Sequence, residues 1–515
     1  MLVAALLIIG VSSTSAASPP APAPPASKLG WTTTILDGAV SDGAVCLDGS
    51  APGYHIQSKD PERWTIHLQG GGWCTSVQDC FGRSNGALGS SKSFKTDMDS
   101  ILAPTGFWHA GGAHGIFSSD PAVNPDFHNH TKVYARYCDG ASFAGNLDAP
   151  VTAPGKGRSI HFRGRRVLDA VLDSLIAAGL GKAKLFIVNG CSAGGLAVYL
   201  HLDYIASRLP GVRVVGVPEC GLFMDESHWN GKPGFTPTSK NVAQMQNVSG
   251  GVNAGCMTSS AKGEEWKCFM AQYTLPHIQT PHYIVNSFYD AWQWGAVLGM
   301  PNTCHGAGCA GKMPADCPAG AHNALEQLRA NMISNQSHGS NPLSSAFLYA
   351  CNTHCGQFSH DDRWGTLEVK GKSLRSSFTH WLTGATGTPA TVDCDGLGCN
   401  PTCCDSNSEA GSTLLLETGS DLIWPPEHPE WPEWQTVAGN TTCFQGTSCA
   451  AHYSSNGRGC CPYEGAVCCP NGQTCCPGGT TCSDNGTYLT TCMKGTTKIS
   501  QGLSVWYVSR MLLLI

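Results

Sequence analysis

The chain has 515 residues, of which 13% are charged, and it is rich in glycine (62) and proline (31). At roughly 150 residues per domain, this length predicts two to four domains, and the low charge excludes a highly charged disordered protein. The formal net charge is −6, with no long run of one sign. Nucleic acid is therefore not expected as a partner, because phosphate binding needs clustered lysine and arginine.

The N-terminal residues 1–17 are predicted to be a signal peptide. Residues 2–11 form an apolar run that is too short to span a bilayer, and small residues follow it. Residues 18–29 are rich in proline and alanine and are expected to be an extended linker. The 27 cysteines favour an oxidising compartment, so we expect a secreted protein. Five Asn-x-Ser/Thr sites are compatible with that route: Asn129, Asn247, Asn335, Asn440 and Asn485.

Residues 30–404 alternate between strand-like apolar runs and helical patterns. The clearest strand-like runs are 64–68, 184–189, 282–286 and 346–350. Residues 163–178 carry apolar side chains at three- and four-residue spacing, which predicts a helix. This alternation indicates an α/β domain with a mostly parallel central sheet.

The composition changes again after Cys404. Residues 405–442 include the Pro/Trp-rich string WPPEHPEWPEW and are predicted to be a linker. Ten cysteines follow between Cys443 and Cys492, in a segment too short to bury much of a core, so disulfides are expected to hold residues 443–492 together. Zinc ligation is the weaker alternative, because the segment offers few histidines. The remaining tail, 493–515, ends in an apolar stretch too short for a membrane span.

The sharpest motif is a G-x-S-x-G sequence at residues 190–194. It directly follows the strand-like run 184–189 and precedes a helix-like segment at 195–209. A nucleophile elbow has this strand-turn-helix context and presents a serine above the sheet edge. A chance match in a glycine-rich loop is the alternative, but the flanking segments favour Ser192 as a nucleophile.

A serine hydroxyl becomes a good nucleophile when a histidine takes its proton and an acid holds that histidine. In α/β-hydrolases these residues follow in the order Ser, Asp/Glu, His. Asp290 ends the strand-like segment 282–290, and His354 comes just after the run 346–350. Position alone leaves several alternatives open, namely His305, His360 and His380 for the base and Asp225 and Asp361 for the acid.

A glycine-rich loop, Gln-Gly-Gly-Gly-Trp at residues 69–73, follows the first strand-like run. Backbone amides in such a loop can stabilise a developing oxyanion, by roughly 3 kcal/mol per donor. The predicted donors are the amides of Gly72, Trp73 and Ala193. An ordinary tight glycine turn is the alternative.

Several long strings in this order resemble the pectin acetylesterase/Notum family of serine esterases. They are CLDGS (46–50), HLQGGGWC (67–74), NPDFHNHTKVYARYCDGASF (124–143), NGCSAGGLAVYLHLDY (189–204), TPHYIVNSFYDAWQ (280–293) and CNTHCGQ (351–357). The resemblance covers roughly residues 30–405. It implies an α/β-hydrolase fold without a metal or cofactor, with Ser192, Asp290 and His354 as nucleophile, acid and base. It also implies an oxyanion hole at Gly72, Trp73 and Ala193.

Some features depart from this family or lie outside it. Glu219 puts a charge where plant members have small residues, and Asp139 fits either a buried turn or a substrate contact. The string 459–482 resembles a granulin module, which suggests binding of a protein or wall partner. Seventeen cysteines precede residue 405, so internal pairing leaves one over, and Cys191 is the candidate for a buried thiol.

The expected function is a secreted, extracellular or cell-wall serine carboxylesterase that removes O-acetyl groups from an acetylated polysaccharide such as pectin. Acid pH is expected to lower its rate as His354 becomes protonated. The nearest alternative is a Notum-like enzyme that removes a long acyl chain from a protein, because acyl-pocket depth depends on loops that the sequence does not place. A third reading is a non-catalytic binding protein that acts through the granulin-like module.

Overall fold

The computed structural model describes residues 30–96, 115–152, 157–301, 304, 317–337, 341–356, 358, 362–384 and 389–403. It also describes the backbone of short strands between residues 447 and 504. The predicted signal peptide (1–17), Pro/Ala linker (18–29) and Pro/Trp-rich linker (405–442) lie outside the described residues, as do His305, His360 and Asp361.

A nine-stranded sheet forms the centre of the molecule, in the order β1-β2-β4-β3-β7-β8-β9-β10-β13. Its strands are β1 (Thr32–Ile35), β2 (Gly53–Gln57), β3 (Asp60–Leu68), β4 (His130–Ala135), β7 (Leu185–Cys191), β8 (Arg213–Glu219), β9 (Tyr283–Ser287), β10 (Ser345–Tyr349) and β13 (Thr391–Val392). The pairings β1–β2 and β2–β4 are antiparallel, and every pairing from β4 to β13 is parallel. The predicted α/β-hydrolase fold with a mostly parallel sheet is confirmed.

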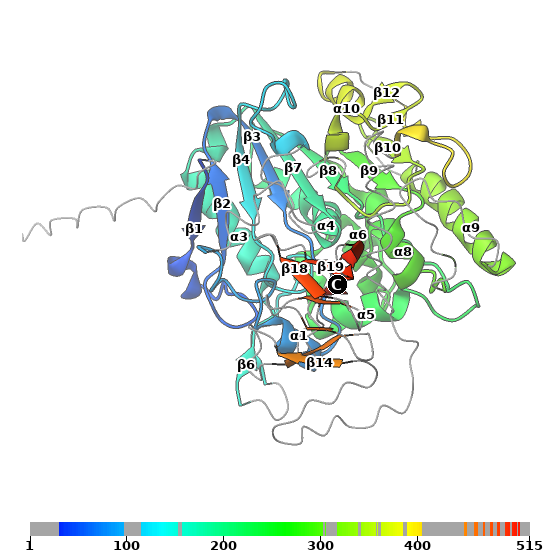
Figure 1. Cartoon of the computed structure of the whole chain (residues 1–515). Coiled ribbons are helices and arrows are strands. Elements are labelled where there is room, and N and C mark those ends of the chain that lie inside the picture. The colour runs from blue at the N-terminus through cyan, green and yellow to red at the C-terminus, as the bar shows by residue number, and fades with distance from the viewer. Residues whose placement is uncertain are drawn as a thin grey trace, which may run out of the picture.

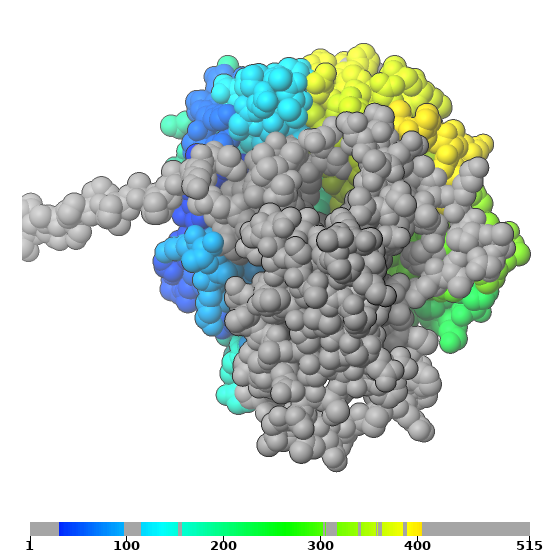
Figure 2. Space-filling view, in the orientation of Figure 1, coloured from blue at the N-terminus to red at the C-terminus, as the bar shows by residue number. Residues whose placement is uncertain are grey.

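The strands cross the molecule from β1 and β2 on one side to β9 and β10 on the other (Figure 1). In the space-filling view, the blue segments that begin the domain and the yellow segments that end it accordingly lie on opposite sides (Figure 2). The carboxyl ends of the parallel strands share one edge of the sheet. The loops that follow β3, β7, β8, β9 and β10 therefore meet there.

Apolar side chains alternate between the two faces of the sheet, because successive residues of a strand point in opposite directions. In β10, Ala346 and Leu348 join a cluster with the helices α3 (Gly164–Ala177) and α4 (Ala193–Ser207). Phe347 and Tyr349 join a second cluster on the other face, with α10 (Leu374–Leu382). Burial on both faces explains why these strands read as continuous apolar runs.

The helix predicted at residues 163–178 is α3. Its buried side chains, Val167, Leu168, Val171, Leu172 and Leu175, recur at the spacing that places them on one face. The helix ends just before Gly179, whose φ of 115° stops the chain from continuing in a helix.

Two long connections between strands contain further helices. Between β8 and β9 lie α5 (Thr236–Met245), α6 (Ala254–Ser259) and α7 (Ala271–Thr274), and between β9 and β10 lie α8 (Ala291–Ala296) and α9 (Ala319–Gln336). Helix α1 (Val77–Arg83) follows the glycine-rich loop. No helix in the described part of the chain is both long enough and apolar enough to cross a bilayer.

Seven disulfides join described cysteines: 46–138, 74–80, 220–355, 256–268, 304–317, 351–403 and 394–399. Such a set is typical of a protein that folds in an oxidising compartment. In the C-terminal part, the described strands form small antiparallel pairings. They are β14 (Thr447–Ala450) with β15 (Arg458–Cys461), β16 (Val467–Cys468) with β17 (Thr474–Cys476) and β21 (Leu503–Ser504), and β18 (Thr481–Asp484) with β19 (Thr490–Lys494) and β20 (Thr497–Gln501).

Candidate active site

The G-x-S-x-G motif forms a sharp turn between β7 and α4. Ser192 lies between the two elements with φ 57° and ψ −124°, a strained conformation for a residue with a side chain. A Cβ atom on Gly194 would lie 1.9 Å from the carbonyl oxygen of Leu68, so only glycine fits where α4 passes β3. This is the geometry of a nucleophile elbow, with Ser192 at its tip.

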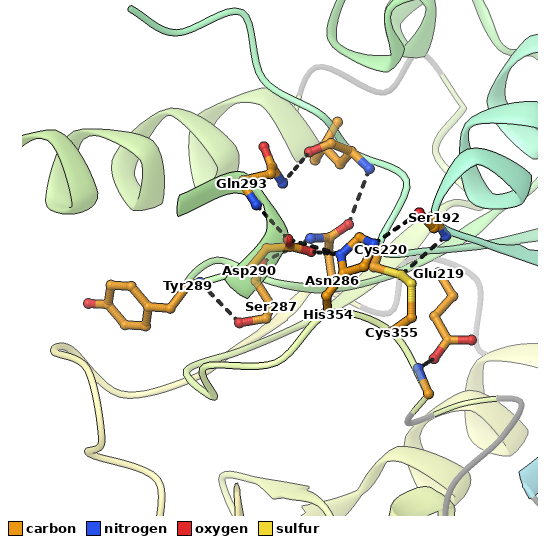
Figure 3. Close-up of polar contacts among 12 residues, drawn as sticks. Ser192, Glu219, Cys220, Asn286, Ser287, Tyr289, Asp290, Gln293, His354 and Cys355 are labelled. Carbon is orange, nitrogen blue, oxygen red and sulfur yellow. Dashed lines mark hydrogen bonds and ion pairs between the residues drawn. A yellow bond between two sulfur atoms is a disulfide. The ribbon is translucent and has the colours of Figure 1, made fainter. Parts of the chain in front are cut away.

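Asp290, His354 and Ser192 lie in one chain of hydrogen bonds, although long stretches of sequence separate them (Figure 3). Nδ1 of His354 lies 2.8 Å from Oδ2 and 3.0 Å from Oδ1 of Asp290, and Nε2 lies 2.9 Å from Oγ of Ser192. An ionised carboxylate only accepts hydrogen bonds, so Nδ1 carries the proton and Nε2 accepts from the serine hydroxyl. Asp290 is fully buried, whereas the His354 side chain keeps 14% of its surface exposed.

Local sequence explains where the acid and the base sit. Asp290 is the N-cap of α8, and its side chain accepts a hydrogen bond from the backbone N–H of Gln293. His354 lies in the loop that follows β10, and the N–H of Ala291 donates to the carbonyl of Thr353 in that loop. Two alternatives from the sequence lie elsewhere. His380 is exposed on α10, and Asp225 accepts hydrogen bonds from Tyr273 and Thr236.

The glycine-rich loop packs directly on the elbow. A Cβ on Gly70 would lie 2.3 Å from the carbonyl oxygen of Cys191 and 3.1 Å from Cβ of Ser192. Gly72 has a φ of 61°, which favours glycine. In the part of the chain that the structure describes, no backbone carbonyl accepts a hydrogen bond from the amide of Gly72 or Trp73. The loop that carries these two amides lies beside Ser192.

A serine hydroxyl connects this loop to the elbow. The indole Nε1 of Trp73 donates to Oγ of Ser142 at 2.8 Å, and that hydroxyl donates to the carbonyl of Ala193 at 2.7 Å. The hydroxyl of Tyr137 accepts from the N–H of Ser142 and donates to the carbonyl of Gly72. The backbones of Gly72, Trp73 and Ala193 are thus held in one network.

Comparison with known proteins identifies the family. The sequence pattern of the Pectinacetylesterase family matches residues 26–404, and that of the Granulin family matches residues 447–493. The chain belongs to the pectinacetylesterase family. As such it is a carboxylic ester hydrolase, which confirms the enzyme class and the two resemblances predicted from the sequence.

Relatives in this family carry two kinds of name. Pectin acetylesterase 5 of Arabidopsis thaliana is 34% identical over 378 residues, which make up 71% of this chain and 83% of the relative. Pectin acetylesterase 7 of the same plant is 33% identical over 380 residues, or 72% of this chain and 92% of the relative. Palmitoleoyl-protein carboxylesterase notum1 of Xenopus laevis is 28% identical over 260 residues, or 48% of this chain and 50% of the relative.

Sequence reasoning missed an aromatic cluster beside the Ser192–His354 pair in this pectinacetylesterase family member. Trp73, Phe223, Phe235 and Trp292 contact one another in all six combinations, with ring centroids 5.0 to 5.9 Å apart. The rings of Phe223 and Trp292 also lie 6.2 and 6.0 Å from the imidazole of His354. The four side chains come from different loops and helices, so no periodic signal in the sequence joins them.

Glu219 and Cys220 are two further residues whose role the sequence did not reveal. Glu219 is buried at the end of β8, and its carboxylate accepts from two backbone amides of the His354 loop. Cys220 forms a disulfide with Cys355, the residue after His354. Cys220, His354 and Cys355 hold ligand-type atoms within 4.8 Å of one another, but both sulfurs are used in the disulfide.

Asp139 and Cys191 have local structural explanations. The carboxylate of Asp139 accepts from the N–H groups of Ala141 and Phe143, as expected for an aspartate in a turn, and burial raises its pKa to about 6. Cys191 carries a buried thiol, as predicted, and burial raises its pKa above the ordinary value. A buried thiol of this kind is a poor nucleophile, since reaction requires the thiolate.

Proposed function

We propose that the chain is a serine esterase in which Ser192, His354 and Asp290 are the nucleophile, base and acid. The hydrogen-bond chain from Asp290 through His354 to Ser192 is the observation that carries this proposal. His354 takes the hydroxyl proton at Nε2 while Oγ attacks the ester carbonyl carbon. The same proton then passes to the departing alkoxide, which leaves an acyl group on Ser192. Water attacks this acyl-enzyme with His354 again as base, and the acid and free enzyme are released.

The proposed oxyanion hole consists of the backbone amides of Gly72, Trp73 and Ala193. Negative charge develops on the carbonyl oxygen beside Ser192, where the glycine-rich loop and the start of α4 adjoin. The N–H of Ala193 lies at the first turn of α4, where helix amides have no partner within the helix. Donors fixed in this way stabilise the tetrahedral intermediate without rearranging.

The proposed substrate is an O-acetyl ester of a cell-wall polysaccharide such as pectin. Two relatives that are 33–34% identical over most of the chain are named pectin acetylesterases. Relatives named palmitoleoyl-protein carboxylesterases are less similar, at 28% identity over about half of the chain or 25% over 70% of it. The aromatic cluster supports a short acyl group as well. Four rings that contact one another beside His354 occupy space that a long alkyl chain would need there.

The proposed location is extracellular, in or near a cell wall, and the seven disulfides support it. The granulin-like module would then bind a protein or wall partner and keep the esterase near its polymer. This role rests on the match to the Granulin family over residues 447–493.

The test is hydrolysis of p-nitrophenyl esters from acetate to palmitate, together with release of acetate from acetylated pectin. We expect the highest rate for acetate, and Ser192→Ala should lower it at least about 10⁴-fold. The control is Ser41→Ala, an exposed serine that bonds only within its own turn. A preference for chains of eight or more carbons would favour a fatty-acyl protein deacylase instead. Hydrolysis that does not depend on Ser192 would overturn the proposed mechanism.

A further inference from the structure

Glu219, at the carboxyl end of β8, contacts both Ser192 and the loop that carries His354. The backbone carbonyl of Glu219 accepts from the N–H of Ser192 at 3.1 Å. Oε1 of the same residue accepts from the N–H groups of Gly356 and Phe358, both at 2.9 Å. Glu219 therefore joins the elbow to the chain that follows His354 (Figure 3).

Cys220 makes a second connection between the same two places. Its sulfur lies 3.2 Å from the amide nitrogen of Ser192 and is bonded to the sulfur of Cys355. Cys220 and Cys355 have φ values of 42° and 60°, which are uncommon for residues other than glycine. Such conformations persist where the surrounding structure fixes them, and they gather at functional sites.

Packing alone is a poor explanation for the Glu219 side chain. It is fully buried, and a buried carboxylate is unfavourable unless hydrogen bonds compensate for the lost water. An apolar side chain of similar size would fill the space at less cost. Among its interactions, the carboxylate accepts two hydrogen bonds from the backbone of the His354 loop, which an apolar side chain could not do.

We infer that Glu219 and Cys220, with Cys355, are positioning residues that set the distance between Ser192 and His354. Asp290 holds the imidazole at Nδ1, and these three residues, here called the β8 clamp, hold the loop backbone from the side of Ser192. The inference rests on the proposed function. A displacement of the base by about 1 Å can cost roughly 100-fold in rate, so loss of the clamp should slow the chemical steps.

The first test replaces the disulfide by two serines, Cys220→Ser with Cys355→Ser. Hydrolysis of p-nitrophenyl acetate should show a kcat lowered about 10- to 100-fold and a KM changed less than about twofold. The matched control is Cys256→Ser with Cys268→Ser, which removes a disulfide that joins α6 to the segment before α7. The control should keep the kcat of the unmodified chain, even if its melting temperature falls.

The second test compares Glu219→Ala with Glu219→Gln. Glutamine keeps a carbonyl oxygen that can accept both amide hydrogen bonds, so it should lose about threefold in kcat, whereas alanine should lose at least about tenfold. If Glu219 only filled space, the kcat values of the two folded variants would not differ in this way. Melting temperatures and near-UV circular dichroism establish that each variant is folded.

The outcomes separate this inference from the proposed function. If the unmodified chain shows no Ser192-dependent hydrolysis, the proposed function fails and the inference falls with it. If that hydrolysis is present but the folded clamp variants keep the full kcat, the inference alone is wrong. Failure of all three clamp variants to fold would assign Glu219 and Cys220 to the fold and would likewise overturn a positioning role.

Discussion

The carboxylate of Asp290 accepts a hydrogen bond from the backbone N–H of Gln293 at 3.0 Å while it holds Nδ1 of His354. One side chain thus begins helix α8 and orients the proposed base. Asparagine is also a good N-cap residue, so Asp290→Asn should preserve the helix. Its neutral amide, however, cannot hold the imidazole in the required tautomer as the carboxylate does. We expect kcat for p-nitrophenyl acetate to fall about 10³- to 10⁴-fold, with little change in melting temperature.

The control for this prediction is Ser373→Ala, which removes the N-cap of α10, where Oγ of Ser373 accepts from the N–H of Ser376. It should cost about 1 kcal/mol in the free energy of unfolding and leave kcat unchanged. If Asp290→Asn kept more than about a tenth of the activity, Asp290 would not be the acid that orients His354.

The aromatic cluster predicts a change in chain-length preference. Removing the ring of Phe235 opens space beside Trp73 and Trp292. Phe235→Ala should therefore raise the octanoate-to-acetate ratio of kcat/KM by about tenfold, since a few methylene contacts are worth that much in a fitted pocket. Phe127→Ala, which removes a buried ring from the cluster on the other face of the sheet, is the matched control. An unchanged ratio in folded Phe235→Ala would mean that these rings do not limit the acyl chain.

Buried histidines predict that acid destabilises the fold. Burial lowers the pKa of His67 to about 4 and those of His130 and His201 to about 3. Histidine in the unfolded state has a pKa near 6.5. Below that pH the unfolded state therefore binds more protons than the folded state does. The stability that these residues contribute is therefore complete above about pH 6.5 and is lost as the pH falls, by roughly 1.4 kcal/mol per pH unit for each histidine. The raised pKa of Asp139 acts in the opposite direction between about pH 4 and 6, but three histidines outweigh it.

His201→Gln checks this assignment. Nε2 of His201 donates to the carbonyl of Ser142, and the amide of glutamine can donate to the same oxygen without titrating. Urea unfolding at pH 7 and pH 5 should show that the variant loses about 2 kcal/mol less than the unmodified chain over this interval. His380→Gln, which replaces an exposed histidine, is the matched control. An identical pH dependence in His201→Gln would contradict the prediction.

The structure separates two of the Asn-x-Ser/Thr sites. Asn247 is exposed in a left-handed turn, and the hydroxyl of Ser249 donates to its Oδ1 at 2.8 Å. Asn335 is buried in α9, where its Nδ2 donates to the carbonyl of Gln272. After secretion from a eukaryotic host, we expect a glycan on Asn247 and none on Asn335.

Peptide mass spectrometry after enzymatic deglycosylation in heavy-oxygen water measures this directly, because each glycosylated asparagine becomes a labelled aspartate. Ser249→Ala should remove the label at residue 247, and Ser337→Ala should change nothing. A glycan found on Asn335 of the folded, active enzyme would show that the burial of this residue does not prevent modification.

Several parts of this arrangement were open to prediction because their signals are local. Strands such as β7 and β10 are buried on both faces and therefore read as apolar runs, and the elbow must have small residues where α4 passes Leu68. Asp290 and His354 stand where two parallel strands end, so chain position brought them into the set of candidates. The resemblance to a family then selected them from several alternatives.

Other parts had no local signal. The pairing of Cys220 with Cys355 spans 135 residues, and many other pairings were available to these cysteines. The sequence marked Glu219 as a charge near the site, but its contacts with Gly356 and Phe358 depend on how β8 and the loop after β10 meet in space. Such contacts depend on how distant loops pack together, and the periodicity of the sequence does not reveal that packing.

The long span of the Cys220–Cys355 disulfide also has a consequence for biosynthesis. At about 5 to 20 residues per second, a ribosome needs roughly 7 to 27 s to add the 135 residues that separate the two cysteines. During this time Cys256 and Cys268 emerge and can compete for Cys220 as partners. Maturation of the enzyme in the cell is therefore expected to depend on disulfide isomerase activity, and its yield on the redox state of the compartment in which it folds.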